Sequence, residues 1–142
     1  MSIEETENEI VEEFELFSDW MDKYQHVIDL AKSVPKIDEK YKNESHEIRG
    51  CQSKVWMHSE IKDGVIFYTA DSDSEITKGL IGIIIRVLSG HTPDEILKSN
   101  LEYLHRIGLQ EHLVLTRANG LNAMINQIKL DAVVHQAVAN TK

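Results

Sequence analysis

The residue with the clearest capacity for covalent chemistry is Cys51, the only cysteine of the chain. It lies in the segment Arg49-Gly50-Cys51-Gln52-Ser53-Lys54, between a polar stretch and a more apolar one. Glycine tolerates turns that present the next side chain at a loop tip, and cationic neighbours such as Arg49 and Lys54 favour the thiolate, the nucleophilic form of cysteine. The local sequence therefore indicates a reactive thiol on a loop.

Two kinds of chemistry could use this thiol. A cysteine hydrolase needs an imidazole oriented on the sulfur and an oxyanion hole; His46 and His58 are the nearest histidines in sequence, but no hydrolase signature surrounds Cys51. A sulfur-relay protein needs an accessible thiolate that attacks another protein's persulfide, and a surface that docks donor and recipient. In a third interpretation Cys51 is inert and the chain is an interaction domain, since most single cysteines are buried small hydrophobes.

Neither a disulfide nor a metal centre is expected. One cysteine cannot close an intramolecular disulfide, and it cannot supply a thiolate cage for zinc or an iron–sulfur cluster. The histidines do not form a pair one helical turn apart, the spacing typical of metal ligands. They are His26, His46, His58, His91, His105, His112 and His135.

Charge is unevenly distributed along the 142 residues, whose formal net charge is −9. The first 22 residues contain nine acidic residues and no basic one, so the rest of the chain is neutral. An acidic protein is an unlikely partner for nucleic acid, which needs clustered lysines and arginines. No apolar run is long enough to span a membrane and no secretory signal is visible, so we expect a cytoplasmic protein.

The elements that must position Cys51 follow from apolar spacing. A first, acidic helix is predicted over about residues 3–17, either as an ordinary amphipathic helix with a solvated face or as an acidic arm that docks a basic partner. A second helix begins at Ser18 or Asp19 and ends before Pro35. Residues 36–50 are predicted to form a loop with a helical turn near Asp38. A third, short strand is expected just before Gly50.

The spacing of apolar residues then changes from that of helices to that of strands. Two runs rich in β-branched and aromatic residues, 53–61 and 65–70, flank Lys62-Asp63-Gly64, which predicts a hairpin with a type I′ turn. Ser72 and Glu75 fit the capping box of an apolar helix in which Gly79 and Gly82 allow close packing. Helices are also predicted from Thr92, over 101–107 and from about Arg117. Helices around a small antiparallel sheet indicate one α+β domain over residues 1–142.

The segment Gly50-Cys51-Gln52-Ser53-Lys54-Val55-Trp56 resembles the signature of the SufE/CsdE sulfur-acceptor proteins. Further similar residues occur in the same order over residues 14–130. They are Trp20, Lys23-Tyr24, Ile28, Pro35, Asp71-Ser72-Asp73, Lys78-Gly79-Leu80, Thr92-Pro93, His112-Leu113, Arg117, Gly120-Leu121 and Ala123-Met124. The chain departs from the family at two places. Pro-Ser is frequent in the family where this chain has Leu115-Thr116, and glycine is frequent where it has Ala70.

The resemblance implies a fold like that of SufE and the IscU-type scaffold, and a protein that is not itself an enzyme. Cys51 would accept persulfide sulfur from a cysteine desulfurase of the SufS or CsdA type, stimulate that enzyme, and pass the sulfur to a SufBCD-type Fe–S scaffold. The chain would hold no cofactor, because pyridoxal phosphate belongs to the desulfurase. Candidates for loop support or partner contact are Arg49, Gly50, Gln52, Ser53, Asp71, Asp73 and Arg117.

Overall fold

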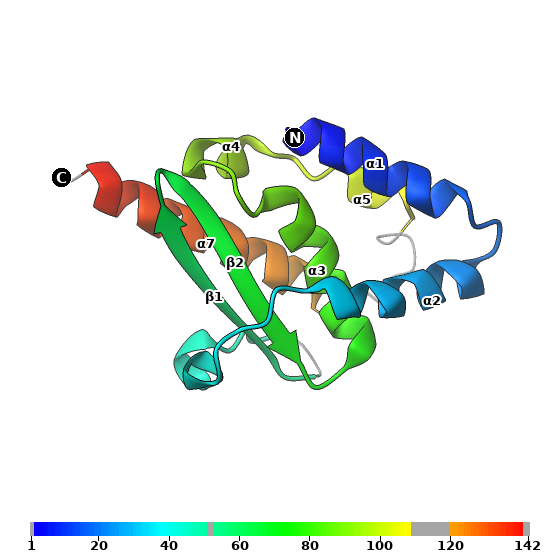
Figure 1. Cartoon of the computed structure of the whole chain (residues 1–142), viewed down its shortest axis with the longest axis horizontal. Helices are drawn as coiled ribbons and strands as arrows, with labels where there is room; N and C mark the ends of the chain where they lie inside the picture. The colour runs from blue at the N-terminus through cyan, green and yellow to red at the C-terminus, as the bar shows by residue number, and fades with distance from the viewer. Residues whose placement is uncertain (1, 51–52, 109–119, 141–142) are drawn as a thin grey trace.

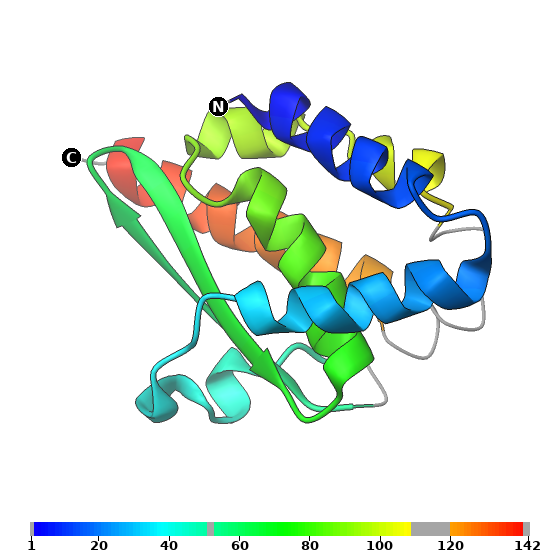
Figure 2. The same cartoon turned by 45° about the vertical axis from the view of Figure 1, so that its right-hand side comes forward.

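A two-stranded antiparallel hairpin packs against helices in the computed structural model, which describes residues 2–50, 53–108 and 120–140. Figures 1 and 2 show the hairpin along one side of the molecule, with α3 and α7 behind it and α1 on the far side. The predicted α+β class is confirmed. In chain order the elements are α1 (Ile3–Glu15), α2 (Trp20–Leu30), η1 (Ala31–Ser33), η2 (Glu39–Tyr41), η3 (Glu44–His46), β1 (Val55–Lys62), β2 (Val65–Ser72), α3 (Glu75–Leu88), α4 (Pro93–Lys98), α5 (Tyr103–Arg106) and α7 (Leu121–Asn140).

The hairpin turn agrees with its sequence. Asp63 and Gly64 both have positive φ, 53° and 83°, as a type I′ turn requires. The register pairs Met57 with Ala70, both buried toward the helices, and Trp56 with Asp71 on the opposite face. This alternation leaves Trp56 and Asp71 on the outer face, where side chains from outside the hairpin can contact them.

Helix α3 forms the centre of the core, and its glycines allow the close approach expected of them. A β-carbon on Gly79 would lie 2.0 Å from the carbonyl oxygen of Val27 in α2, far inside contact distance. On Gly82 it would lie 2.6 Å from a methyl group of Val34. The sequence prediction that these glycines serve packing is therefore confirmed.

The acidic first helix lies on the body of the protein. Ile10, Val11 and Phe14 are buried against the core. The Arg86 guanidinium of α3 donates hydrogen bonds to the carboxylates of Glu9 and Glu13. Glu9 and Glu13 thus help to attach α1 to the body, whereas Glu4, Glu12 and Glu15 are exposed.

Several predicted boundaries were wrong. α1 ends at Glu15, two residues earlier than expected. The N-cap of α3 is Ser74, because Ser72 belongs to β2 and its hydroxyl donates to the Lys54 carbonyl instead. α7 begins at Leu121, directly after Gly120, which has φ of 67°. The third strand before Gly50 is reduced to a single bridge between Glu47 and Trp56. Within the described ranges, no helix has the length and apolar character that crossing a membrane requires.

Candidate functional site

Residues 49–54, which we call the Cys51 loop, lie between Ile48 and Val55, whose backbones are hydrogen-bonded to each other. The Ile48 N–H donates to the Val55 carbonyl over 2.8 Å, next to the bridge between Glu47 and Trp56. Cys51 and Gln52 themselves lie outside the described residues. The site is therefore defined by the residues on each side of them.

The exit of the loop is fastened to the end of β2. The Lys54 N–H donates to a carboxylate oxygen of Asp73 over 3.0 Å, and the Asp73 N–H donates back to the Lys54 carbonyl over 3.2 Å. The Ser72 hydroxyl donates to the same carbonyl over 2.7 Å. Three bonds thus fix the backbone directly after the half-buried Ser53.

Asp71 joins the outer face of the hairpin to two lysines. The Lys42 ammonium donates to its carboxylate over 2.9 Å and lies 5.0 Å from the centre of the Trp56 ring, while Lys78 Nζ of α3 lies 3.4 Å from its other oxygen. Burial would raise the pKa of Asp71, but hydrogen bonds from Lys42 and from the Ser72 N–H, with the charge of Lys78, outweigh it and lower this pKa. Asp71 therefore carries a full negative charge that two cations neutralise.

The entry of the loop rests on α7. Gly50 has φ of +99°, a conformation that side-chain-bearing residues rarely adopt, and a β-carbon on it would lie 3.2 Å from the β-carbon of Ala123. Arg49, immediately before it, is exposed. The backbone conformation thus favours glycine strongly, and the neighbouring helix leaves little room for a β-carbon.

The structure separates the predicted site residues into two groups. Ser53, Asp71 and Asp73 lie near the exit of the loop, whereas Arg49 and Gly50 lie near its entry. Arg117, like Gln52, lies outside the described residues. Asp71 bonds to Lys42 and Lys78, which come from segments outside the loop.

Three contributors were missed from sequence. Lys42 lies in an unpatterned polar stretch, and only the fold brings it to Asp71, 29 positions away. Lys78 appeared in the family motif but was given no role. Ala123 was recognised as part of a helix, and its contact with Gly50 depends on where α7 crosses the loop. No short-range pattern encodes these contacts.

The histidines proposed for a hydrolase have other partners in the structure. The His58 ring stacks on Tyr41 at 3.6 Å between centres and its Nε2 lies 3.1 Å from Glu60. His46 Nδ1 lies 3.0 Å from the Asn43 side-chain oxygen. Among the described residues, no three histidine, cysteine, aspartate or glutamate side chains are grouped so that they could hold a metal ion.

Comparison with known proteins finds a family model and relatives that match this sequence. The model of the SufE family, described as an Fe–S metabolism associated domain, matches residues 8–132. An uncharacterized SufE-like protein of Rhizobium meliloti is 35% identical over 130 residues, covering 88% of this chain and 93% of the relative. A SufE-like protein of Synechocystis sp., also uncharacterized, is 31% identical over 127 residues, covering 89% and 80%.

A solved structure shows the same fold. The solution structure of a hypothetical protein from Thermus thermophilus superposes with a TM-score of 0.75 at 18% identity, covering 93% of this chain and 96% of that one. At this identity the likeness concerns the fold alone. From the family match and the relatives together, the chain belongs to the SufE family, whose domain is associated with Fe–S metabolism.

Proposed function

We propose that this protein is a sulfur acceptor and carrier for Fe–S cluster assembly, with Cys51 as the sulfur-bearing residue. The observation that carries the proposal is the position of the only cysteine: it lies inside the segment matched by the family, between Gly50, which packs on Ala123, and Lys54, which is bonded to Asp73. The donor is a pyridoxal-phosphate cysteine desulfurase of the SufS or CsdA type, which the protein stimulates. The recipient is a SufBCD-type scaffold, and the compartment is the cytoplasm.

The proposed transfer is a thiol–persulfide exchange that needs no external oxidant. The Cys51 thiolate attacks the terminal sulfur of the donor's persulfide, and a new sulfur–sulfur bond forms as the donor's bond breaks. The donor cysteine leaves as a thiolate, and the terminal sulfur, with its proton, becomes the persulfide on Cys51. Transfer to the scaffold repeats the exchange with Cys51 as the leaving thiolate.

The charges around the loop support this chemistry. The exposed cations Arg49 and Lys54 lie within three positions of Cys51. Of the carboxylates near the exit of the loop, Asp73 accepts a hydrogen bond from the Lys54 N–H and Asp71 is paired with Lys42 and Lys78. A cationic environment favours the thiolate that attacks, and it also favours the anionic persulfide that results. The chain needs no cofactor of its own for this exchange.

Desulfurase turnover tests the proposal. Alanine release by the cognate cysteine desulfurase is measured with cysteine as substrate, with the wild-type protein and with Cys51→Ser. We expect the wild type to accelerate alanine release and Cys51→Ser to leave it at the basal rate. Equal stimulation by both proteins would contradict the role of Cys51, and a wild type without effect would contradict the sulfur-acceptor function. A thiol-dependent enzyme would instead consume a small substrate without the desulfurase.

A further inference from the structure

The outer face of α7 is apolar where a surface helix ordinarily carries charge. Leu130 and Val134 are 53% and 52% exposed, and Val133 and Val138 are exposed to a similar extent. Lys129 and Asp131 are the only charged residues in this 20-residue helix. The side turned to the core is formed by other residues, such as Ile128 and Ala132, so α7 is apolar on both sides. Contiguous exposed apolar side chains mark interaction surfaces.

This apolar strip, Leu130, Val133, Val134 and Val138, lies on the same side of α7 as Ala123, which contacts the Cys51 loop. Steps of three and four residues lead along one side of the helix from Ala123 through Gln127 and Leu130 to Val134. Ala123, at the first turn, is covered by Gly50 of the loop, whereas the later turns are open. Ala123 and Val138 are about 22 Å apart along the helix. One partner can therefore cover the strip and the loop together.

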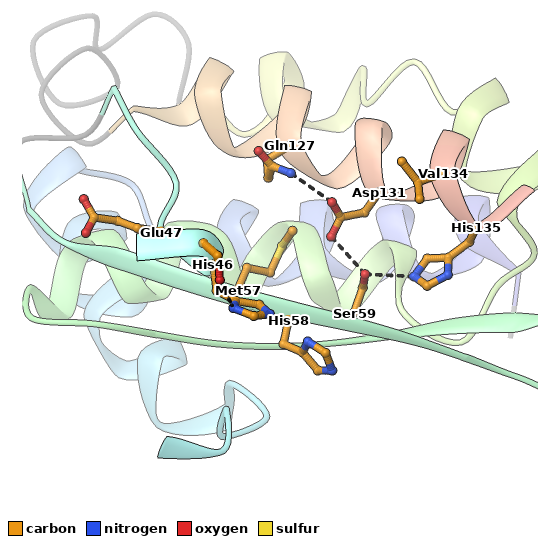
Figure 3. A pocket seen from close by; sticks show the side chains of 10 residues that line it. His46, Glu47, Met57, His58, Ser59, Gln127, Asp131, Val134 and His135 are labelled. Atoms are coloured by element: carbon orange, nitrogen blue, oxygen red, sulfur yellow. Dashed lines mark hydrogen bonds between the residues drawn. The ribbon is translucent and has the colours of Figure 1, made fainter. Parts of the chain in front are cut away.

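A polar pocket of about 290 Å³ adjoins the strip between α7 and β1, and Val134 belongs to both (Figure 3). The Ser59 hydroxyl donates to Asp131 over 2.9 Å, and the Gln127 amide donates to the other carboxylate oxygen over 2.9 Å. Because the only hydroxyl hydrogen of Ser59 is used in the bond to Asp131, the Ser59 oxygen is left to accept from His135 Nε2, 3.0 Å away, in the tautomer that carries a proton there. Asp131 is thus held rigidly in the pocket wall.

The charge of the pocket favours a cation. Its titratable side chains are the carboxylates of Asp131 and Glu47 and the imidazoles of His46, His58 and His135. With histidines counted as neutral, as in the net charge of the chain, the formal charge of the pocket is that of its two carboxylates. A lysine or arginine side chain is the complementary group that another protein can supply, and the excess acid of the whole chain attracts a basic surface as well.

We propose that the apolar strip and this pocket form a docking surface for the sulfur-donating desulfurase, an inference that rests on the proposed function. The desulfurase presents aliphatic side chains to Leu130 and Val134 and a basic side chain to Asp131. A second copy of this chain fits less well, because two acidic chains would bring like charges together. Each partner of a standard interface buries roughly 800 Å², more than four half-exposed side chains supply, so the desulfurase must also contact the neighbouring Cys51 loop.

A pair of matched double variants tests the surface. Leu130→Ser with Val134→Ser removes the centre of the strip. Leu16→Ser with Met21→Ser is the control, since these side chains are 82% and 73% exposed, Leu16 as the C-cap of α1 and Met21 in the first turn of α2. Figure 1 shows the end of α1 and the start of α2 on the opposite side of the molecule from the C-terminal half of α7. Calorimetric titration with the cognate desulfurase gives the affinity, and circular dichroism confirms that both variants are folded. We expect the strip variant to bind about tenfold more weakly and the control to bind like wild type.

Asp131→Asn tests the pocket separately. This variant keeps the side-chain shape, so we expect weaker binding at low salt and wild-type binding at high salt, where charge is screened. If the wild type binds and stimulates the desulfurase but the strip variant does so equally, the docking surface is wrong and the proposed function stands. If the wild type neither binds nor stimulates, both fail. A wild-type dimer that the strip variant abolishes, with desulfurase binding unchanged, would assign the surface to a second copy.

Discussion

Gly50 and Ala123 lie against each other where the Cys51 loop meets α7, with room for a hydrogen but hardly for a β-carbon, which would lie 3.2 Å from that of Ala123. The same glycine has φ of +99°. Position and conformation of the residue before Cys51 are therefore set by a helix that begins about 70 residues later in the chain. This contact links the loop to the elements around it.

The first prediction concerns this glycine. Gly50→Ala introduces backbone strain of about 1–2 kcal/mol and forces the loop away from Ala123, so we expect lower stability in urea and slower sulfur uptake. Gly64→Ala is the control, because Gly64 has φ of +83° but no atoms near its missing β-carbon. The control should lose similar stability and take up sulfur at the wild-type rate. Normal uptake by Gly50→Ala would show that the loop does not depend on this contact.

The second prediction concerns Asp71. Asp71→Asn removes the charge that holds Lys42 and Lys78, and we expect a loss of about 1 kcal/mol at neutral pH for this half-exposed cluster. Because the pKa of Asp71 is lowered in the folded protein, its contribution is complete above about pH 4 and disappears as pH falls through the folded pKa. Urea unfolding from pH 7 to about pH 3 should thus show the variant and wild type converging in acid. A constant difference would mean that the charge of Asp71 is not what stabilises the cluster.

The third prediction separates the two uses of the acidic helix. Changing Glu4, Glu12 and Glu15 together to glutamine removes only exposed charges, so stability should stay within about 0.5 kcal/mol. If the acidic surface steers a basic desulfurase, stopped-flow association should be slower at low salt and equal to wild type at high salt. If the variant and the wild type associate at equal rates at low salt, the acidic surface is only a solvated helix face.

Glu13→Gln is the matched comparison for that experiment. Its carboxylate accepts hydrogen bonds from Arg86, which hold the pKa of Glu13 below its ordinary value despite burial. We expect this variant to lose about 1 kcal/mol of stability without the salt-dependent change in association. Deleting residues 1–13 would be a poor test of steering, because it would also remove the core contacts of Ile10 and Val11.

The sequence was sufficient for features determined by neighbours in the chain. The hairpin with its type I′ turn, the helix that starts at Thr92 and the α+β class were all confirmed. The start of α3 was wrong because two serines compete: Ser72 and Ser74 both precede the helix, and tertiary pairing with Lys54 takes Ser72. A capping motif alone cannot distinguish them.

Only part of the candidate site could be predicted from the sequence. Cys51 could be selected from its uniqueness and its flanking residues, and the resemblance supplied its family. The Lys42–Asp71 pair, the Gly50–Ala123 contact and the network of Ser59, Asp131 and His135 join segments far apart in the chain. Such contacts depend on where elements cross, which local spacing does not determine.

The fourth prediction tests the packing of α2 on α3. Gly79→Ala places a methyl group 2.0 Å from the backbone oxygen of Val27, and the helices must separate, which we expect to cost about 3 kcal/mol. Gly82→Ala meets only the end of the Val34 side chain, which can rotate, so its cost should be clearly smaller. Thermal unfolding of the two variants measures the difference. Equal losses would mean that the crossing at Val27 is looser than the structure indicates.

The most direct measurement of the central claim is the intact mass of this protein after incubation with the cognate cysteine desulfurase and cysteine. We expect an adduct of one sulfur atom, carried on Cys51, removed by dithiothreitol and absent from Cys51→Ser. An unmodified wild-type mass while the desulfurase itself carries persulfide, or an adduct that persists in Cys51→Ser, would contradict it.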